Sequence, residues 1–507
     1  MSRKLLFKII YSAIISVGFI FAVSCASEEG GSAPPSAGDT EERYMGAADA
    51  GQTEYTEDGQ QLARAQAYIF PENVDFEGQN IRILNHDRAY WAWSELMAET
   101  MTGEPINDAI YTRNAMVEEG LNVTITEIHV SDAPGMASRS IMAGLDEFDV
   151  VFTDSSQAGI LASRGMYLNL RNVPGLNLDA LWWNQNANQS AELLGRLFFT
   201  TSDASLVTND ALWVLYFNTV MLQDLQLPNP YDLVREGRWT MDALYDMVRA
   251  AARDVNGSGV WGVDDIWGIS SHHTSFLAFF LCQGQQLIRR DDQGHPYLVT
   301  PDERFLRAHY LARRLMDYQH GLYLSVNMQW PGRTADLGHA TATFMNNMSL
   351  FCAETLSHAR RFREMTADFG LLPHPKTDEH QENHYTLMIG TIPAFGIPIT
   401  VADPEKSGIF MDAFTGVSAD VLMPAYYDVS LAGRFTRDED SVEMLDIIRE
   451  GRRFELAVLY NWADLYRAFT THGVSPGGEN PIVFYETHIN SVTSAIQQTL
   501  DRFMEID

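Results

Sequence analysis

The amino-acid sequence predicts an α/β fold built on a doubly wound, largely parallel sheet. Between residues 81 and 152, short apolar runs alternate with amphipathic stretches in the order strand, helix, strand, helix, strand. The last run, 149–152, is rich in β-branched residues, which is typical of a strand buried on both faces. Ligands of such sheets bind beyond the carboxyl ends of the strands, here at 85–87 and 153–156.

Each element of this stretch has a local cause. Residues 81–84 form a short apolar run that predicts the first strand. Pro105 opens a helix, because proline suits a first helical turn, and Gly120 ends it. Val123 and Ile125 alternate with threonines in a second strand. The apolar residues of the helix share one face: Ile106, Ala109, Ile110 and Val117.

Helices dominate the later part of the chain. We expect them at 239–253, 303–318 and 441–452, where the apolar residues recur with helical spacing. Asp440 and Glu443 have the spacing of a capping box for the last of these helices.

The N-terminus predicts export. Three basic residues precede the uncharged, apolar stretch 9–24, which is too short to span a bilayer and ends in small residues. Cys25 at the expected cut resembles the lipobox of bacterial lipoproteins, although Ala22 stands where leucine is usual. The resemblance implies a signal peptide over 1–24 and a lipid, such as palmitate, on the Cys25 thiol. An ordinary signal peptide with an incidental cysteine is the alternative.

A linker follows the expected anchor. Residues 25–75 begin with a stretch rich in Gly, Ser, Ala and Pro, in which acidic residues greatly outnumber basic ones. Such a segment buries too little apolar area to offset its ordering entropy, so we predict that it is disordered and extended by its own charge.

Charge and cysteine content exclude several classes of function. The net charge is -32, and the exported part carries -35, because residues 1–24 contribute three positive charges. Nucleic acid is therefore not an expected partner. About 430 residues remain after the linker, enough for two domain-sized cores. Cys282 and Cys352 could pair in an oxidising compartment, but we interpret them as two buried free thiols.

Several segments, taken in order, resemble the bacterial extracellular solute-binding proteins of the sugar-binding group. The family's first helix is resembled by residues 103–114, and the stretch after it by 149–151 together with 161–170. Its "YN" strand is resembled by residues 215–218. GRWTMDAL at 237–244 is similar to the family's "GKWTWDEL", with two residues replaced. The segments 254–269 and 370–376 resemble "NGDG…yG" and the return crossing "G..P.PK". The matches extend from about residue 80 to 460.

This resemblance implies a type II periplasmic-binding-protein-like fold, in which two α/β lobes are joined by hinge segments and close on a ligand. The first lobe would comprise 76–202 and return at 377–430, and the second would comprise 203–376. Residues 431–507 would form helices that pack across both lobes. The resemblance also implies a monomer whose partners are a small ligand, the membrane and the permease subunits of an ABC importer.

The expected ligand is a carbohydrate, which needs aromatic platforms and polar groups for its hydroxyls. Residues of both kinds occur near the predicted strand ends, the first crossing and irregular stretches. Each tryptophan could equally be a packed core residue, as we expect of Trp182 and Trp183 in a surface helix. The candidate ligand-binding residues are Asp87, Trp91, Trp93, Asp154, Ser155, Asp210, Trp213, Trp330 and Trp462.

One loop has the spacing of an EF-hand. Its candidate calcium ligands are Asp254, Asn256, Ser258 and Asp265, with Gly259 at the tight turn. Position 12 is Asp rather than the longer Glu, and Gly-rich turns of this composition are common without metal. We therefore expect no cofactor, with a structural calcium as the alternative.

The sequence shows no pattern typical of a zinc site or of a common catalytic or nucleotide-binding motif. His374, His380 and His384 do not have the spacing of a zinc site, and we interpret them as part of a solvated turn. The sequence has no nucleophile elbow, P-loop or dinucleotide-binding motif. We expect a lipid-anchored carrier outside the cytoplasm that captures a carbohydrate, most simply an oligosaccharide, and does no chemistry. A secreted carbohydrate hydrolase and a surface sensor or adhesion protein are the alternatives.

Overall fold

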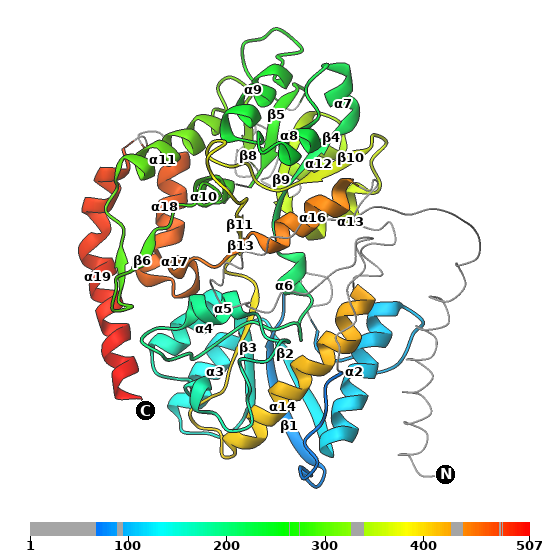
Figure 1. Cartoon of the computed structure of the whole chain (residues 1–507), viewed down its shortest axis with the longest axis vertical. Coiled ribbons are helices and arrows are strands. Elements are labelled where there is room, and N and C mark those ends of the chain that lie inside the picture. The colour runs from blue at the N-terminus through cyan, green and yellow to red at the C-terminus, as the bar shows by residue number, and fades with distance from the viewer. Residues whose placement is uncertain are drawn as a thin grey trace, which may run out of the picture. The chain divides into compact units, whose positions relative to one another are not determined.

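The computed structural model describes residues 67–88, 95–262, 264–272, 274–325, 339–426, 440–475, 478 and 480–506. All of them belong to one compact unit of the chain. This unit contains two separate mixed sheets, each covered by helices, and the chain passes between them more than once (Figure 1). We call the sheet of β1, β2, β3 and β12 with its helices lobe 1, and the sheet of β4, β5, β8, β9 and β10 with its helices lobe 2.

Lobe 1 contains the predicted strand–helix alternation. Its sheet has the order β12-β3-β1-β2, with β1, β2 and β3 parallel and β12 antiparallel to β3. All five elements predicted between residues 81 and 152 are confirmed. The elements of lobe 1 are β1 (Gln79–His86), α2 (Pro105–Leu121), β2 (Val123–Val130), α3 (Ala133–Met142), β3 (Val150–Asp154), α4 (Ser155–Ser163), η1 (Leu170–Asn172), α5 (Gln185–Ala191), β12 (Pro393–Gly396), α14 (Pro404–Val417) and the π-helical turn η3 (Ser418–Leu422).

Lobe 2 has a five-stranded sheet in the order β10-β4-β9-β5-β8. Strands β5, β8 and β9 are parallel, and β4 is antiparallel to both β9 and β10. The elements of lobe 2 are β4 (Trp213–Asn218), α7 (Thr219–Asp224), α8 (Pro230–Arg235), α9 (Met241–Ala251), β5 (Trp267–Ser271), α10 (Ser275–Leu281), α11 (Glu303–Leu315), β8 (Tyr323–Ser325), α12 (His339–Met345), β9 (Ser349–Thr355), η2 (Leu356–His358), α13 (Ala359–Phe362), β10 (Phe369–Leu372) and α16 (Asp440–Glu450). Between α10 and α11, β6 (Ile288–Arg290) and β7 (Pro296–Leu298) form a separate two-stranded sheet.

The three helices predicted in the later part are present as α9, α11 and α16, each slightly shorter than expected. Asp440 and Glu443 do more than begin α16, because both carboxylates accept hydrogen bonds from Arg235 of α8. The two cysteines are buried and free, as predicted. Within the described residues, none of the helices combines the length and apolar composition that crossing a bilayer requires.

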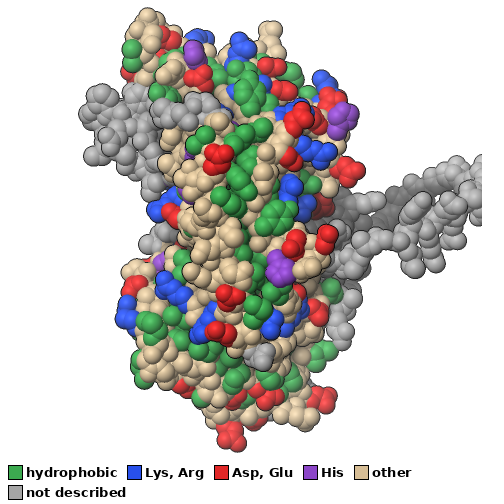
Figure 2. Space-filling view, turned by 90° about the vertical axis from the view of Figure 1, so that its left-hand side faces the viewer, with side chains coloured by type: hydrophobic (Ala, Val, Ile, Leu, Met, Phe, Trp, Pro, Cys, Tyr) green, Lys and Arg blue, Asp and Glu red, His purple; other side chains and the backbone are tan. Residues whose placement is uncertain are grey.

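The C-terminal elements contact both lobes. Helix α17 packs on α4 of lobe 1, α18 packs on α10 of lobe 2, and α19 lies against both β7 and α4. Near its end, Phe503 contacts Phe198 with ring centroids 4.1 Å apart. The face that carries α11 and α19 shows acidic and basic side chains interspersed, with hydrophobic side chains between them (Figure 2). These elements are α17 (Leu456–Leu459), η4 (Trp462–Asp464), α18 (Leu465–Val474) and α19 (Pro481–Glu505).

One buried cation ties lobe 1 to the segment that leaves it. Arg113 of α2 is fully buried and donates to the Ala204 and Leu96 carbonyl oxygens and to the Ser418 hydroxyl of η3. Its guanidinium carbon also lies 3.8 Å from the centre of the Phe414 ring. Burial lowers the pKa of Arg113 to about 9. The Arg113 guanidinium is therefore hydrogen-bonded to neutral carbonyl and hydroxyl oxygens, and to no carboxylate among the described residues.

Candidate functional site

The carboxyl ends of the parallel strands of both lobes adjoin the segments that cross between the lobes. In lobe 1, Asp154 at the end of β3 is paired with Pro393, where β12 begins. In lobe 2, Thr355 at the end of β9 is paired with Trp213, where β4 begins. We call these strand ends, taken together, the interlobe edge. It corresponds to the place where ligands of such sheets bind.

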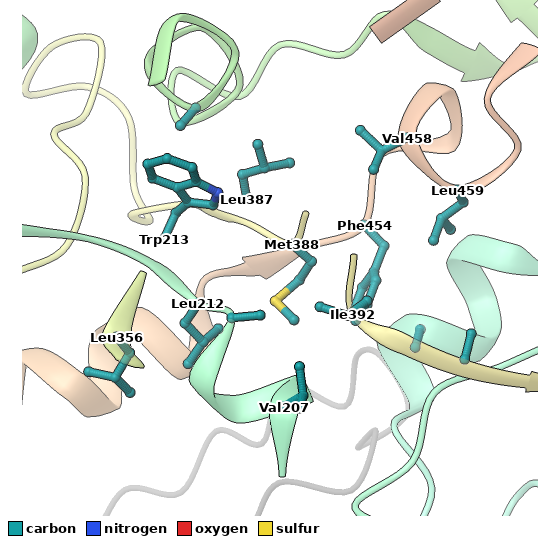
Figure 3. Close-up of a cluster of buried hydrophobic side chains, with 14 of the residues drawn as sticks. Val207, Leu212, Trp213, Leu356, Leu387, Met388, Ile392, Phe454, Val458 and Leu459 are labelled. Carbon is teal, nitrogen blue, oxygen red and sulfur yellow. The ribbon is translucent and has the colours of Figure 1, made fainter. Parts of the chain in front are cut away.

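Three described segments cross between the lobes, at 200–212, 386–392 and 452–455. They bond to one another: Leu212 forms an antiparallel bridge with Met388, and β11 (Thr386–Leu387) pairs in parallel with β13 (Arg452–Arg453). The side chains around the crossing form a cluster that we call the hinge core (Figure 3). All are at most 6% exposed: Val207, Leu212, Trp213, Leu356, Leu387, Met388, Ile392, Phe454, Val458 and Leu459.

Lobe 1 contributes a fixed carboxylate to the interlobe edge. The Asp154 Oδ1 accepts a 2.8 Å hydrogen bond from Nε of the fully buried Arg88, and His86 Nδ1 lies 3.2 Å from the same oxygen. Arg88 also donates to the His86 carbonyl oxygen and to the Asn85 amide oxygen. The Asp154 side chain stays 12% exposed and that of His86 17%. The arrangement thus presents a compensated carboxylate and an imidazole side by side.

The neighbouring predicted residues differ in exposure. Asp87 is the most open of them, with its side chain 39% exposed and 3.9 Å from His129. Ser155 is fully buried, and its hydroxyl donates to the Gly390 carbonyl oxygen of the second crossing segment. Ser155 therefore joins lobe 1 to a crossing segment.

Asp210 is engaged inside the hinge region. It lies in α6 (Val207–Asp210) and is fully buried, with Oδ2 accepting from Arg360 at 2.9 Å and Oδ1 from the Tyr426 hydroxyl at 2.8 Å. Burial raises the pKa of the Asp210 carboxyl, although the Arg360 charge opposes this. Both oxygens are occupied, so Asp210 acts as a link between the first crossing segment, α13 and the chain after η3.

Two of the predicted tryptophans are packed inside the protein. Trp213 is 4% exposed within the hinge core, and its indole nitrogen has no hydrogen-bond partner among the described residues. Trp462 is 3% exposed, stacks on Tyr460 at 4.8 Å and donates to the Thr499 hydroxyl of α19. Trp91, Trp93 and Trp330 lie outside the described residues, as does Cys25.

The sequence interpretation missed a second carboxyl at the interlobe edge. Glu354 in β9 has its side chain 10% exposed, with His358 Nδ1 3.8 Å away and the Thr355 hydroxyl 3.1 Å from that same nitrogen. Burial raises the pKa of Glu354 to about 8 and lowers that of His358 to about 4. The sequence contains a pattern that could have identified Glu354. This residue directly follows the apolar run 350–353, just as Asp154 stands at the end of the apolar strand β3.

In the loop with EF-hand spacing, the carboxylate and amide oxygens accept hydrogen bonds from the loop's own backbone. Asp254 accepts from the backbone N–H groups of Ser258 and Gly259, and Asn256 also accepts from Ser258. The buried Asp265 accepts from the N–H groups of Val255 and Gly262. In the described part of the chain, no three or more His, Cys, Asp or Glu residues form a group that could hold a metal ion. Calcium in this loop stays the alternative to the expectation of no cofactor.

Two interpretations of local segments were wrong. His374 and His384 are buried rather than part of a solvated turn, and His384 Nδ1 lies 2.8 Å from the His374 carbonyl oxygen. Burial lowers the pKa of each to about 4. Trp182 and Trp183 are not in a helix; both indoles donate to Oδ1 of Asp412 in α14. A distant carboxylate, invisible in the local sequence, fixes this pair.

Known structures share this fold. A sugar transporter protein from Rhizobium etli, in an open conformation, matches with a TM-score of 0.53 and 14% identity, over 84% of this chain and all of its own. An ABC substrate-binding protein from Listeria monocytogenes, in complex with cycloalternan, matches with a TM-score of 0.50 and 10% identity, over 85% of this chain and all of its own. A cyclo/maltodextrin-binding protein complexed with maltotetraose matches with a TM-score of 0.50 and 9% identity, over 84% of this chain and 97% of its own.

No family model matches the sequence, and no curated protein is similar to it. At these identities the structural likeness shows the fold. The predicted two-lobed, periplasmic-binding-protein-like architecture is therefore confirmed.

Proposed function

We propose that the protein is a lipid-anchored, extracellular solute-binding protein that captures a carbohydrate and delivers it to an ABC importer. The observation that carries this proposal is the two-lobed fold, which is shared with proteins described as sugar-binding or as ABC substrate-binding proteins. These neighbours are binding proteins, which favours capture without chemistry over the hydrolase alternative.

The chemistry at the interlobe edge supports a polyhydroxylated ligand. Lobe 1 offers Asp154 and His86 there, and lobe 2 offers Glu354 and His358. A fixed carboxylate accepts hydrogen bonds from sugar hydroxyls, and a carboxyl with a pKa of about 8 can also donate one near neutral pH. Our proposal assigns the aromatic platforms to Trp91, Trp93 and Trp330.

The hinge core supports lobe closure. Its side chains come from segments far apart in the sequence, and the short pairings between these segments let a few backbone dihedral angles absorb a rotation. Closure would bring the polar groups of the two lobes onto opposite sides of one ligand.

The central experiment is a calorimetric titration of the protein with a panel of oligosaccharides, with product release followed in the same samples. We expect 1:1 binding without turnover, and weaker binding for Asp154→Asn by at least about tenfold, because a charged hydrogen-bond acceptor is lost. Asp146→Asn is the matched control, since Asp146 precedes β3 at the opposite end of the strand. Turnover without a stable complex would contradict the carrier function.

The anchor is tested separately. Cys25→Ser should release an otherwise intact binder from the membrane fraction, because no thiol remains to be acylated. A variant that stays with the membrane would contradict lipid attachment at Cys25 and leave the binding function unaffected.

A further inference from the structure

A cavity lies at the far end of lobe 2 from the interlobe edge. Strand β4 leads from Trp213 in the hinge core to Asn218 at the cavity, about 16 Å at roughly 3.3 Å per residue. The cavity has a volume of about 560 Å³, within the range of small-molecule sites. It is therefore distinct from the site proposed for carbohydrate.

The polar floor of this cavity is preformed. Asn218 caps α7 by accepting from the Met221 N–H group, and its amide nitrogen donates to the Asn347 amide oxygen at 2.8 Å. Asn347 has a left-handed backbone, with φ of 59°, and its own amide nitrogen lies 3.3 Å from the Thr366 hydroxyl. Each amide is therefore held in place by neighbours before any ligand arrives.

The walls are largely apolar, with one charge of each sign among them. Val220, Met221, Leu225, Ala251 and Ile266 supply the apolar surface, and Val220 is 44% exposed. Asp224 and Arg253 also line the cavity, yet neither makes an ion pair or side-chain hydrogen bond with any described residue.

The two charges have different surroundings. Asp224 is the last residue of α7, and the carbonyl oxygens of the three residues before it already accept from the N–H groups of Leu225, Leu227 and Gln226. The group at this end of α7 that favours an ammonium is therefore the Asp224 carboxylate. Arg253, two residues beyond α9, offers a planar fork of donors that suits a carboxylate.

We propose that this cavity binds a small zwitterion with an apolar side chain, namely a free α-amino acid or a dipeptide. The ammonium group pairs with Asp224, the carboxylate pairs with Arg253, and the side chain covers the apolar wall. A simple anion or cation would satisfy one of the two charges and face repulsion from the other.

The test is a calorimetric titration of the full chain with L-leucine and L-leucyl-L-leucine, beside N-acetyl-L-leucine amide, which has the same side chain and no charge. We expect saturable binding of at least one zwitterion and none of the capped compound. Asp224→Asn and Arg253→Gln should each weaken binding roughly tenfold or more, because each removes one charged partner. Both side chains are exposed, so melting temperatures should stay unchanged.

Asp292→Asn and Arg304→Gln, two exposed residues outside the cavity, are the matched controls and should bind as the wild type does. If neither zwitterion binds at concentrations up to roughly 10 mM, the proposal is overturned. Equal binding of the capped compound, or unchanged affinity in both charge variants, would do the same. Loss of leucine binding in Asp154→Asn, with both charge variants normal, would place the ligand at the interlobe edge instead.

Discussion

Glu354 makes a sharp prediction about stability and pH. Its carboxyl is buried at the end of β9, and burial raises its pKa from 4.5 to about 8. The folded protein therefore binds this proton more tightly than the unfolded chain does. Stability is greatest below pH 4.5 and is lost as the pH rises toward 8, because over that interval the unfolded chain releases this proton while the buried carboxyl keeps it.

The size of the effect follows from the shift. At 1.36 kcal/mol per pKa unit, the shift corresponds to about 5 kcal/mol in total, and roughly half of it falls between pH 5 and pH 7. Glu354→Gln replaces the carboxyl by a neutral amide of the same shape. The free energy of unfolding of the variant should therefore rise relative to the wild type by that amount over the same interval.

The assay is urea denaturation of both proteins at half-unit steps from pH 5 to pH 8. The new amide can shift the free energy of unfolding by the same amount at every pH. Such a shift does not affect the test, because the test compares how steeply the free energy of unfolding changes with pH. Glu119→Gln, an exposed carboxyl on α2, is the control and should follow the wild-type slope. If the wild type and Glu354→Gln have parallel curves, Glu354 does not titrate as its burial requires and the reasoning fails.

Three further predictions concern buried residues. Trp213→Ala should lower the free energy of unfolding by about 3–5 kcal/mol, measured by urea denaturation, because it opens a cavity in the hinge core. A variant with near-normal stability but weak ligand binding would instead return Trp213 to the ligand site. Arg113→Met should cost about 3 kcal/mol in the same assay, since the Ala204 carbonyl oxygen and the Asn114 amide oxygen each lose a buried donor. An unchanged midpoint would show that these groups are satisfied otherwise. His374→Leu should reduce the loss of stability between pH 6.5 and pH 4, because in the wild type the unfolded chain takes up a proton there that the buried imidazole, with its pKa lowered to about 4, does not. Thermal melting across that interval checks this, and an acid limb as steep as that of the wild type would contradict it.

Local sequence patterns were sufficient to predict a strand or helix whose structure depends on its own residues. The alternation of Val123 and Ile125 with threonines, and the proline that opens α2, predicted elements that the structure contains. The polar residues at the ends of β1 and β3 also lie at the predicted edge of the sheet. These features depend on residues a few positions apart, so periodicity and capping reveal them.

The sequence by itself determined the α/β class, the order of the elements in lobe 1 and the carboxylate at the end of β3. Only the tertiary structure decided which candidates are open and which are packed. Asp210 is buried because Arg360 and Tyr426, 150 and 216 residues away, take its two oxygens. Trp213 is buried because the crossing segments converge on it. Burial of a side chain is set by its partners in space, and those partners come from parts of the chain that no local pattern connects.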